Sequence, residues 1–438
     1  MTGISADLQE LVRRAGAAQP AVAAIDLDER LRRLAAGRSS LAAAAPRIVD
    51  AAVAEVGIPR RFARREVQSA LGVLDALPEL AEAIRPRSVP ARAGRTVLEW
   101  CPFGVVLGGR AANTPVWVPT HDAPSALAGG NAVLARPSSR TRATTGLVLD
   151  ALAAHWARGA IVVVHAPGPL AEPLIWADGV HAVVTHAGGA TCARQLAGLG
   201  AACMAGARMR PYIPEGPGND ALIVLAGADM ERAARAIALA GFANGGQLCM
   251  AAKRIIVERA AWPVLEPALV AAVGALVVGD ADDEATDVAP LPEGRARALA
   301  RAALAEALDA GGRIVVGRGE SGSHITPTVV LLPEGARDVA LWREETFAPV
   351  RGLMLAEDVT DAIARANDSR YGLGAAVFGP DGGRAGDLRV ARVMLDESPL
   401  YQDPHVVVGG VGDSGLAGAR PKIEQLVYAR RTHRGAVA

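Results

Sequence analysis

The stretch FANGGQLCMAAKR (242–254) holds a single cysteine, Cys249, shortly after two glycines and before small residues that favour a helix. Glycines allow a substrate to approach the backbone closely, and a cysteine thiolate is a strong nucleophile. An unpaired cysteine is, however, more often buried and inert. This segment alone therefore leaves two interpretations of Cys249 open, a nucleophile and a core residue.

Two polar residues elsewhere fit the steps that a nucleophilic cysteine would need. Glu215, in YIPEGPGND, lies between Pro and Gly, where a carboxylate could activate water as a general base. Asn113, in GGRAANTPVWVP, follows an apolar run at a strand-to-helix turn, where its side-chain N–H could stabilise an oxyanion. A solvated loop carboxylate and an ordinary turn asparagine are the alternatives, so neither residue decides the chemistry alone.

The elements around these residues alternate between helices and strands. Residues 1–85 have apolar positions at three- and four-residue spacing, which predicts helices, and the Pro- and Gly-containing segment 85–95 ends that pattern. Four apolar runs with helical segments between them then indicate a parallel, doubly wound α/β sheet. The predicted strands are 104–109, 131–137, 160–168 and 181–189.

A second α/β run follows Cys249, and the break between the two runs falls near residues 214–220. A chain of 438 residues is long enough for two or three domains. Cys249 is therefore predicted to lie where two α/β domains meet, which is a common place for an active site.

The composition argues against several classes of function. The 46 basic residues balance 46 acidic ones, so the chain has no electrostatic footprint for nucleic acid or an anionic membrane. Its four cysteines form no C-x-x-C pair and no Cys/His cluster, and neither a metal site nor a disulfide framework is expected. No apolar run reaches about 18 residues and no secretory signal is visible, so we expect a cytoplasmic protein. Only Lys253 and Lys422 are lysines, and neither has the surroundings of a Schiff-base nucleophile.

Several motifs in a fixed order make the chain, from about residue 95 onwards, resemble the NAD(P)-dependent aldehyde dehydrogenase superfamily. GGQLCMAAKR matches the catalytic-cysteine segment G-Q-x-C-x-A-x-x-R, and PEGPGND aligns with the glutamate segment E-L-G-G-K, 34 residues earlier. AANTP matches P-W-N-x-P at its Asn and Pro, and LAGGNAVLARPSS resembles the segment that ends in Lys-Pro-Ser-Glu. REETFAPV and ANDSRYGLGAAVF match two further motifs, E-E-x-F-G-P-V and A-N-x-x-x-Y-G-L.

The resemblance implies a role for each matched residue. Cys249 would attack the aldehyde carbon, and the Asn113 side chain and the Cys249 backbone N–H would hold the oxyanion. Loss of hydride to the nicotinamide would leave a thioester, which water activated by Glu215 would hydrolyse to the carboxylic acid. Glu345 would hold the nicotinamide ribose, with Phe347 packed nearby.

The resemblance also implies a cofactor site that departs from the family pattern. Arg136 takes the place of the usual lysine at the adenosine ribose, and Ser139 replaces the glutamate of Lys-Pro-Ser-Glu. An acidic residue there would repel the 2′-phosphate of NADP, so Ser139 predicts NAD or NADP with a slight preference for NADP. Gly188 and Gly189 are the candidate neighbours of the pyrophosphate, with a plain turn as the alternative.

The fold implied by the resemblance has two doubly wound α/β domains, one for the cofactor and one for catalysis, and a small bridging element for oligomer contacts. We expect residues 1–218 to form the N-terminal helices and cofactor domain, with the bridge at about 86–103. Residues 219–406 would form the catalytic domain and 407–438 a C-terminal return. A homodimer is expected, with a tetramer as the alternative. By position, the candidate substrate-pocket residues are Trp117, His121, Leu248, Met250 and Tyr401, the last in the loop 399–405 with Gln402 and His405.

Three alternatives to a hydrolytic aldehyde dehydrogenase remain at this point. A CoA-acylating member of the superfamily would pass the thioester to CoA and usually lacks the glutamate. A cysteine hydrolase without redox chemistry would need a histidine base, and no histidine lies near Cys249 in the sequence. A non-catalytic binding protein on the same fold would not need Cys249, Asn113, Glu215 and Glu345 together.

Overall fold

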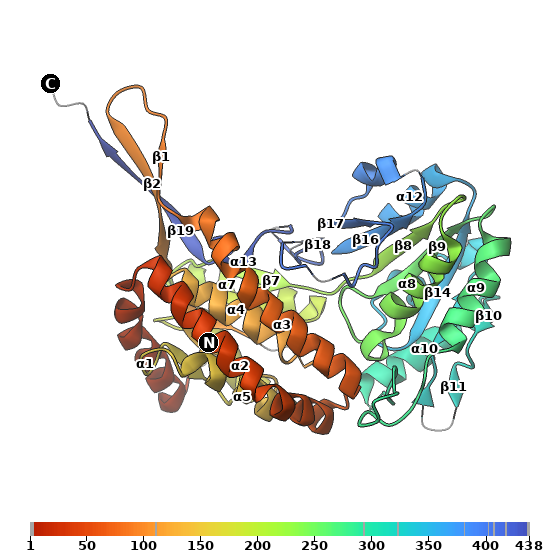
Figure 1. Ribbon diagram of the computed structural model, residues 1–438, viewed down its shortest axis with the longest axis horizontal. Coiled ribbons are helices and arrows are strands. Elements are labelled where there is room, and N and C mark those ends of the chain that lie inside the picture. Colours follow the sequence, from red (N-terminus) through yellow and green to blue (C-terminus); the bar gives the residue numbers. More distant parts are fainter. Residues whose placement is uncertain are drawn as a thin grey trace.

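The computed structural model describes residues 4–109, 112–291, 294–321, 324–380, 382–401, 403–405, 408–416 and 418–435. Two sheets form the two halves of the body, and a narrow arm projects from one of them (Figure 1). In these residues, no helix has both the length and the apolar character needed to cross a membrane.

The first sheet is parallel throughout, with strand order β5-β4-β3-β6-β7. Its strands are short apolar runs because helices cover both of their faces. The strand order reverses between β3 and β6, and ligands of such sheets bind beyond the carboxyl ends of the strands at this point. The strands are β3 (Val105–Gly108), β4 (Ala132–Ala135), β5 (Ile161–Val163), β6 (Ala182–His186) and β7 (Tyr212–Glu215).

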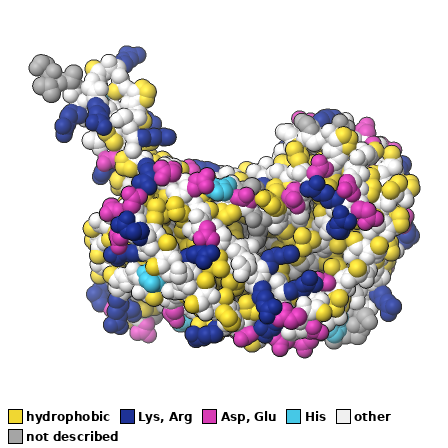
Figure 2. Space-filling view, viewed as in Figure 1, with side chains coloured by type: hydrophobic (Ala, Val, Ile, Leu, Met, Phe, Trp, Pro, Cys, Tyr) yellow, Lys and Arg dark blue, Asp and Glu magenta, His cyan; other side chains and the backbone are white. Residues whose placement is uncertain are grey.

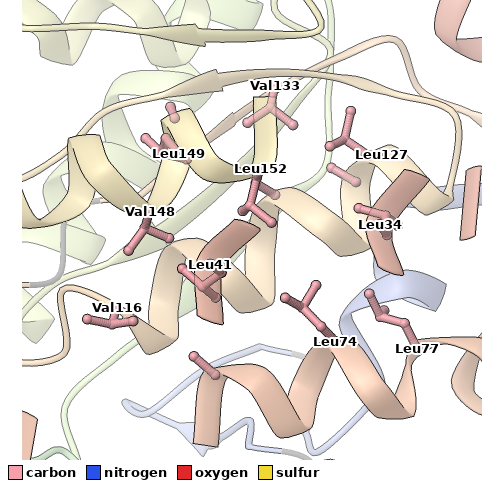
Figure 3. Packing of buried hydrophobic residues seen from close by; sticks show 14 of the residues in the cluster. Leu34, Leu41, Leu74, Leu77, Val116, Leu127, Val133, Val148, Leu149 and Leu152 are labelled. Carbon is pink, nitrogen blue, oxygen red and sulfur yellow. The ribbon is translucent and has the colours of Figure 1, made fainter. Parts of the chain in front are cut away.

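Successive strand residues of the first sheet contact helices on opposite faces. Val106 and Val133 belong to the core with helices α2, α3, α4 and α5, which Figure 3 shows from close by. Leu107 and Leu134 belong to the core on the other face, with helices α1, α6 and α7. The helices are α1 (Ala6–Ala23), α2 (Leu27–Val56), α3 (Arg60–Leu80), α4 (Trp117–Ala128), α5 (Arg142–Ala153), α6 (Gly168–Ala171) and α7 (Gly189–Met204).

The second sheet has strand order β10-β13-β14-β9-β8-β16-β17 and is parallel except for β10. Two hydrophobic clusters cover its two faces. The strands are β8 (Asp220–Val224), β9 (Ala252–Glu258), β10 (Arg313–Val316), β13 (Thr328–Leu331), β14 (Val350–Ala356), β16 (Gly374–Phe378) and β17 (Arg392–Leu395). The helices are α8 (Met230–Phe242), α9 (Trp262–Gly274), α10 (Arg295–Asp309), α11 (Ala340–Arg343) and α12 (Val359–Asn367).

The arm is an antiparallel ribbon of β1 (Arg87–Val89), β2 (Arg95–Pro102) and β19 (Val427–Arg434). It stands clear of the body, and basic side chains lie along it (Figure 2). Before β19, the chain forms the short helix α13 (Lys422–Gln425) and the strand β18 (Val411–Gly412), which pairs with β15 (Tyr371–Gly372). The remaining elements are η1 (Ala81–Ile84), η2 (Glu172–Trp176), η3 (Ala243–Gly246), β11 (Glu320–Ser321), β12 (His324–Ile325), η4 (Glu334–Ala336) and η5 (Gly382–Asp387).

The predicted fold class, a doubly wound α/β protein with helices in residues 1–85, is confirmed. The observed strands are shorter than the predicted ones. The largest difference is in the predicted strand 160–168, which ends as a strand at Val163, with Pro167 following. Pro cannot donate to a strand ladder and limits the residue before it. The two sheets divide between β7 and β8, and the domain limits at 218 and 406 stay predictions.

Candidate active site

A cavity of about 350 Å³ lies between the carboxyl ends of strands in the first sheet and the amino ends of strands in the second. Asn113 lies before α4, Glu215 ends β7, and Cys249 stands shortly before β9. All three candidate catalytic residues line this cavity, although they come from three separate parts of the chain. Seven other predicted residues line it as well, namely Gly188, Glu345, Phe347, Trp117, His121, Leu248 and Met250.

The turn before Cys249 has a left-handed backbone, with φ of 52° at Asn244 and 73° at Gly246. Only glycine fits at 246, because a Cβ there would overlap the guanidinium of Arg351. The buried Arg351 donates hydrogen bonds to the carbonyl oxygens of Gly241 (2.7 Å) and Gly246 (3.1 Å). The turn is thus fixed by hydrogen bonds from a buried cation, which places Cys249 at the cavity wall.

The Cys249 thiol lies in an environment that favours its neutral form. Burial raises the pKa of Cys249 to about 11; Lys253 acts against this, while the carboxylates of Glu345, Asp220 and Glu215 add to it. Lys253 donates hydrogen bonds to the carbonyl oxygens of Leu248 (2.6 Å) and Cys249. The Lys253 ammonium therefore holds the backbone around Cys249 in place. The pKa of Cys249 is raised despite this nearby positive charge.

Asn113 is held in place by two hydrogen bonds to the cysteine turn. Nδ2 of Asn113 donates to the backbone carbonyl oxygen of Gln247 (3.0 Å). The backbone carbonyl oxygen of Asn113 accepts from Nδ2 of Asn244 (2.9 Å). An amide Nδ2 carries two hydrogens. One of them orients the side chain, and the second is available to an oxyanion formed beside Cys249.

Glu215 forms an ion pair with the buried Lys422 of α13. The Gly-Pro loop that follows it, which departs from the family pattern, is held by residues 408–416 and 418–422, here called the closing segment. Gly216 N–H donates to the carbonyl oxygen of Ser414 (2.9 Å), and Oγ of Ser414 donates to the carbonyl oxygen of Pro217 (2.6 Å). The closing segment therefore fixes both the backbone and the carboxylate of this loop.

Glu345 joins the cysteine segment to the start of β8. Its Oε1 accepts from the N–H of Gly218 (2.9 Å) and lies 3.5 Å from Nζ of Lys253. Burial raises the pKa of Glu345, and Lys253 and the Gly218 N–H act against that rise. The ring of Phe347 lies 5.8 Å from the same ammonium. Both predicted residues thus surround the Lys253 side chain at one wall of the cavity.

Comparisons with known proteins agree with this arrangement. The model of the aldehyde dehydrogenase family matches residues 2–429. Vanillin dehydrogenase of Pseudomonas fluorescens is 30% identical, over 97% of this chain and 89% of its own length. The chain belongs to the aldehyde dehydrogenase family. The activity that follows is oxidation of an aldehyde with NAD or NADP, and the CoA-acylating and hydrolase alternatives are not favoured.

Two further proteins are similar to this chain, one in sequence and one in fold. The NAD(P)+ succinate semialdehyde dehydrogenase of Escherichia coli is 29% identical, over 89% of this chain and 85% of its own length. The crystal structure of an aldehyde dehydrogenase from Brucella melitensis biovar abortus superposes with a TM-score of 0.91 at 24% identity, covering 100% of this chain and 91% of that one.

The residues that could hold the cofactor of this aldehyde dehydrogenase lie at the edge where the first sheet reverses its strand order. Gly188 precedes α7 with no side-chain cap, so the first amide groups of this helix can bind an anion such as a pyrophosphate. Gly189 is the first residue of α7 and lies near Pro217. Arg136 follows β4 on the other side of β3 and is buried, whereas Ser139 is exposed in the next turn. These residues would hold a dinucleotide: the start of α7 would bind its pyrophosphate, and Arg136 and Ser139 would lie beside its adenosine ribose.

The candidate substrate side of the cavity is lined mostly by aromatic and apolar residues. The rings of Trp117 and His121 stack, with centroids 4.7 Å apart and planes 12° apart. Tyr401 lines a smaller neighbouring hollow that shares Trp117, His121 and Met250 with the main cavity. His405 points to Glu79 at 3.4 Å, outside both, and Gln402 lies outside the described residues.

Several charged residues around this cavity were not predicted from the sequence. His186 at the end of β6 contacts Asp122 of α4, with 3.0 Å between Nε2 and Oδ2. Burial would raise the pKa of Asp122, but His186, His121 and Lys422 outweigh it and hold that pKa well below its usual value. Glu66 of α3 accepts hydrogen bonds at 2.8 Å from the N–H groups of the two residues that begin α4. The presence of only two lysines is the sequence feature that could have drawn attention to Lys422, but the sequence analysis used it only to argue against a Schiff-base nucleophile.

Proposed function

We propose that the chain oxidises an aldehyde to a carboxylic acid through a covalent intermediate on Cys249, and that water activated by Glu215 releases the product. The observation that carries this proposal is the shared cavity of Cys249, the Asn113 amide and the Glu215 carboxylate. A nucleophile, an oxyanion donor and a general base around one space are the parts that acyl transfer needs.

In the first step, the Cys249 thiol loses its proton to water and the sulfur bonds to the aldehyde carbon, while the π electron pair of the C=O bond moves to the oxygen, which becomes an oxyanion. The second hydrogen of Asn113 Nδ2 and the Cys249 backbone N–H stabilise it. When bound, NAD(P) supplies the hydride acceptor of the oxidation, which leaves a thioester on Cys249. Glu215 then takes a proton from water as the water oxygen bonds to the thioester carbon and the C–S bond breaks.

An absorbance assay at the reduced-nicotinamide band tests this proposal. Wild type and Cys249→Ala are compared on a panel of aldehydes with NAD and NADP, with and without CoA. We expect product in the wild type, none in the variant, and no requirement for CoA. Activity that persists in Cys249→Ala, or that appears only with CoA, would overturn it.

We also propose a slight preference for NADP. Support comes from Ser139 in place of an acidic residue, with the exposed Arg140 beside it. A glutamate at 139 would repel a 2′-phosphate. We therefore expect Ser139→Glu to lower kcat/KM for NADP at least tenfold, about 1.4 kcal/mol, while kcat/KM for NAD holds or rises. Ser138→Ala is the control. Equal changes for both cofactors would contradict the assignment.

For the substrate, we propose an aldehyde with a flat or apolar body, because Phe62, Trp117, Leu248, Met250 and Phe347 line the cavity. The named relatives act on vanillin and on succinate semialdehyde. These two compounds separate an aromatic from an anionic preference, and we expect the higher kcat/KM with vanillin. A higher value with succinate semialdehyde would contradict this proposal.

A homodimer joined through the arm remains a proposal as well, supported by the ribbon's projection from the body and by the exposed ring of Tyr428. Sedimentation velocity of wild type and Tyr428→Arg tests it, with dimer expected only in the wild type. The cytoplasmic location stays a prediction from the sequence.

A further inference from the structure

The chain has only two lysines among its 46 basic residues, and both lie at the candidate active site. Lys253 is 1% exposed and Lys422 is 2% exposed. Lysine is normally a surface residue that is almost never fully buried unless it is paired. All other Lys or Arg positions of this chain are arginine, and the two lysines both lie in buried, paired positions.

Each of the two ammonium groups contacts an active-site carboxylate. Lys253 lies 3.5 Å from Glu345 and braces the Cys249 backbone. Lys422 contacts Oε1 of Glu215. Lysine presents a compact charge on a flexible stem, whereas arginine presents a wide, planar fork. A small buried space beside a single carboxylate oxygen suits the lysine.

Lys422 reaches Glu215 from a segment that also holds the Glu215 loop. The closing segment binds the loop backbone through Ser414, and a Cβ on Gly216 would come within 2.7 Å of the Asp413 carbonyl oxygen. Lys422 follows at the start of α13, so loop and ammonium are fixed relative to each other by one continuous stretch of chain. Other charged or titratable groups near this pair are Asp122 and His121 on α4, His186 on β6, Arg392 on β17 and Cys249.

We propose that Lys422 is a positioning residue for hydrolysis of the acyl-enzyme. Its ammonium binds Oε1 of Glu215, which fixes the position of the carboxylate and leaves the second oxygen to take a proton from water. The water oxygen bonds to the thioester carbon, the C–S bond breaks, and the electron pair returns to the Cys249 sulfur. This inference rests on the proposed role of Glu215 as the general base.

Kinetics separate the acylation and hydrolysis steps. In Lys422→Met we expect the pre-steady-state burst of reduced cofactor to persist, because Cys249 and Asn113 are unchanged. The steady-state rate should fall about tenfold to 100-fold, part of what a general base contributes. Hydroxylamine, which attacks a thioester without a base, should restore turnover. Glu424→Gln on the same helix, which removes a charge whose partner is Arg420, is the matched control and should match wild type.

A second measurement does not depend on activity. Protein labelled with ¹⁵N at the lysine side chains has only two Nζ signals, so each can be assigned with one variant. We expect a protonated, slowly exchanging Lys422 signal that shifts or broadens in Glu215→Gln, while the Lys253 signal keeps its position. This readout remains available if Lys422→Met does not fold.

The outcomes distinguish the two proposals. If Glu215→Gln leaves the steady-state rate unchanged, the proposed role of Glu215 fails. If Glu215→Gln slows hydrolysis but Lys422→Met does not, the proposed role of Lys422 alone fails. The same conclusion follows if the Lys422 NMR signal is unchanged in Glu215→Gln. A loss of the burst in folded Lys422→Met would make Lys422 a structural residue and overturn its role as a positioning residue.

Discussion

The Cys249 thiol has a raised pKa of about 11, caused first by burial and then by nearby carboxylates. Below that pH the sulfur is mainly neutral, and the reactive thiolate is about one part in ten thousand at pH 7. We expect alkylation of Cys249 by iodoacetamide to be slow at pH 7 and to rise about tenfold per pH unit up to pH 10. Mass spectrometry of the peptide that contains Cys249 distinguishes it from the other cysteines. A rate that levels off near pH 8 would contradict the prediction.

Asn113 uses one amide hydrogen to bind Gln247, and in the proposed mechanism the other is donated to the oxyanion. Removal of an oxyanion donor in a well-studied hydrolase costs about 10²–10³-fold in rate. We expect Asn113→Ala to lower kcat by about that factor with little change in aldehyde KM. Asn113→Asp, which places a negative oxygen there, should be at least as slow. A fall in kcat of less than about threefold for Asn113→Ala would contradict this role.

Individual site residues could be predicted from the sequence where they lie within a recognisable local motif. Cys249, Asn113 and Glu215 were found in this way, and they line one cavity. Lys422 and His186 were not, because their partners Glu215 and Asp122 are 207 and 64 positions away and a pair of that separation leaves no local pattern.

Among the elements, the loop after β7 depends on Gly216. A Cβ there would lie 2.7 Å from the Asp413 carbonyl oxygen. We expect Gly216→Ala to destabilise the protein by about 1–3 kcal/mol, as overpacking does, and to slow hydrolysis more than the burst. Gly200→Ala is the matched control, because Gly200 lies inside α7 with open space around it and should stabilise the protein by about 0.5–1 kcal/mol. Thermal unfolding of both variants checks this, and equal effects would contradict it.

The buried carboxylate of Glu66 accepts hydrogen bonds from the backbone N–H groups at the start of helix α4. Burial raises the pKa of Glu66 to about 7, and the N–H groups of Trp117 and Val116 act against that rise. The folded state therefore binds more protons than the unfolded state between about pH 4.5 and 7. This contribution to stability is complete below pH 4.5 and is lost as the pH rises through 7.

Glu66→Gln should remove this dependence, because the amide oxygen can accept the same hydrogen bonds without a charge. We expect it to exceed wild type in stability above pH 7 by up to about 3 kcal/mol and to match it near pH 4.5. Urea unfolding across this pH range measures the difference. A variant that is less stable than wild type at pH 8 would show that the charged form is favoured.

Strands could be predicted from the sequence where helices cover both faces of their sheet. Apolar runs marked β3, β4, β5 and β6 because helices cover both faces of that sheet. The strands of the arm gave no such signal. β19 is exposed along nearly its whole length, and its sequence VYARRTHR has no apolar face. Its pairing with β2, more than 300 positions earlier, is a property of the folded chain.

Across the whole molecule, an ionic contact joins the first turn of α3 to residues 280–287 of the other half. Arg60 pairs with Asp282, Arg61 with Asp287 (2.5 Å) and Arg64 with Glu284 (2.6 Å). Exposed pairs contribute about 0.2–1 kcal/mol each and weaken with salt. The same helix places Phe62 and Arg65 at the cavity wall.

We expect the triple alanine variant at 60, 61 and 64 to lose about 1–3 kcal/mol of stability at low salt and to raise the aldehyde KM with kcat largely kept. In 1 M NaCl the difference in stability should shrink. Urea unfolding at two salt concentrations measures this, and a difference that does not change with salt would point to packing rather than charge.

The closing segment has one more consequence, which concerns the order in which the chain is made. A ribosome adds Asn113, Glu215 and Cys249 well before it adds Ser414 and Lys422. A nascent chain with both sheets already formed would still lack the groups that hold the Glu215 loop, and β2 would lack its partner β19. Residues from Val411 onwards therefore complete both the Glu215 side of the cavity and the arm, so a chain terminated before residue 411 would be deficient in both.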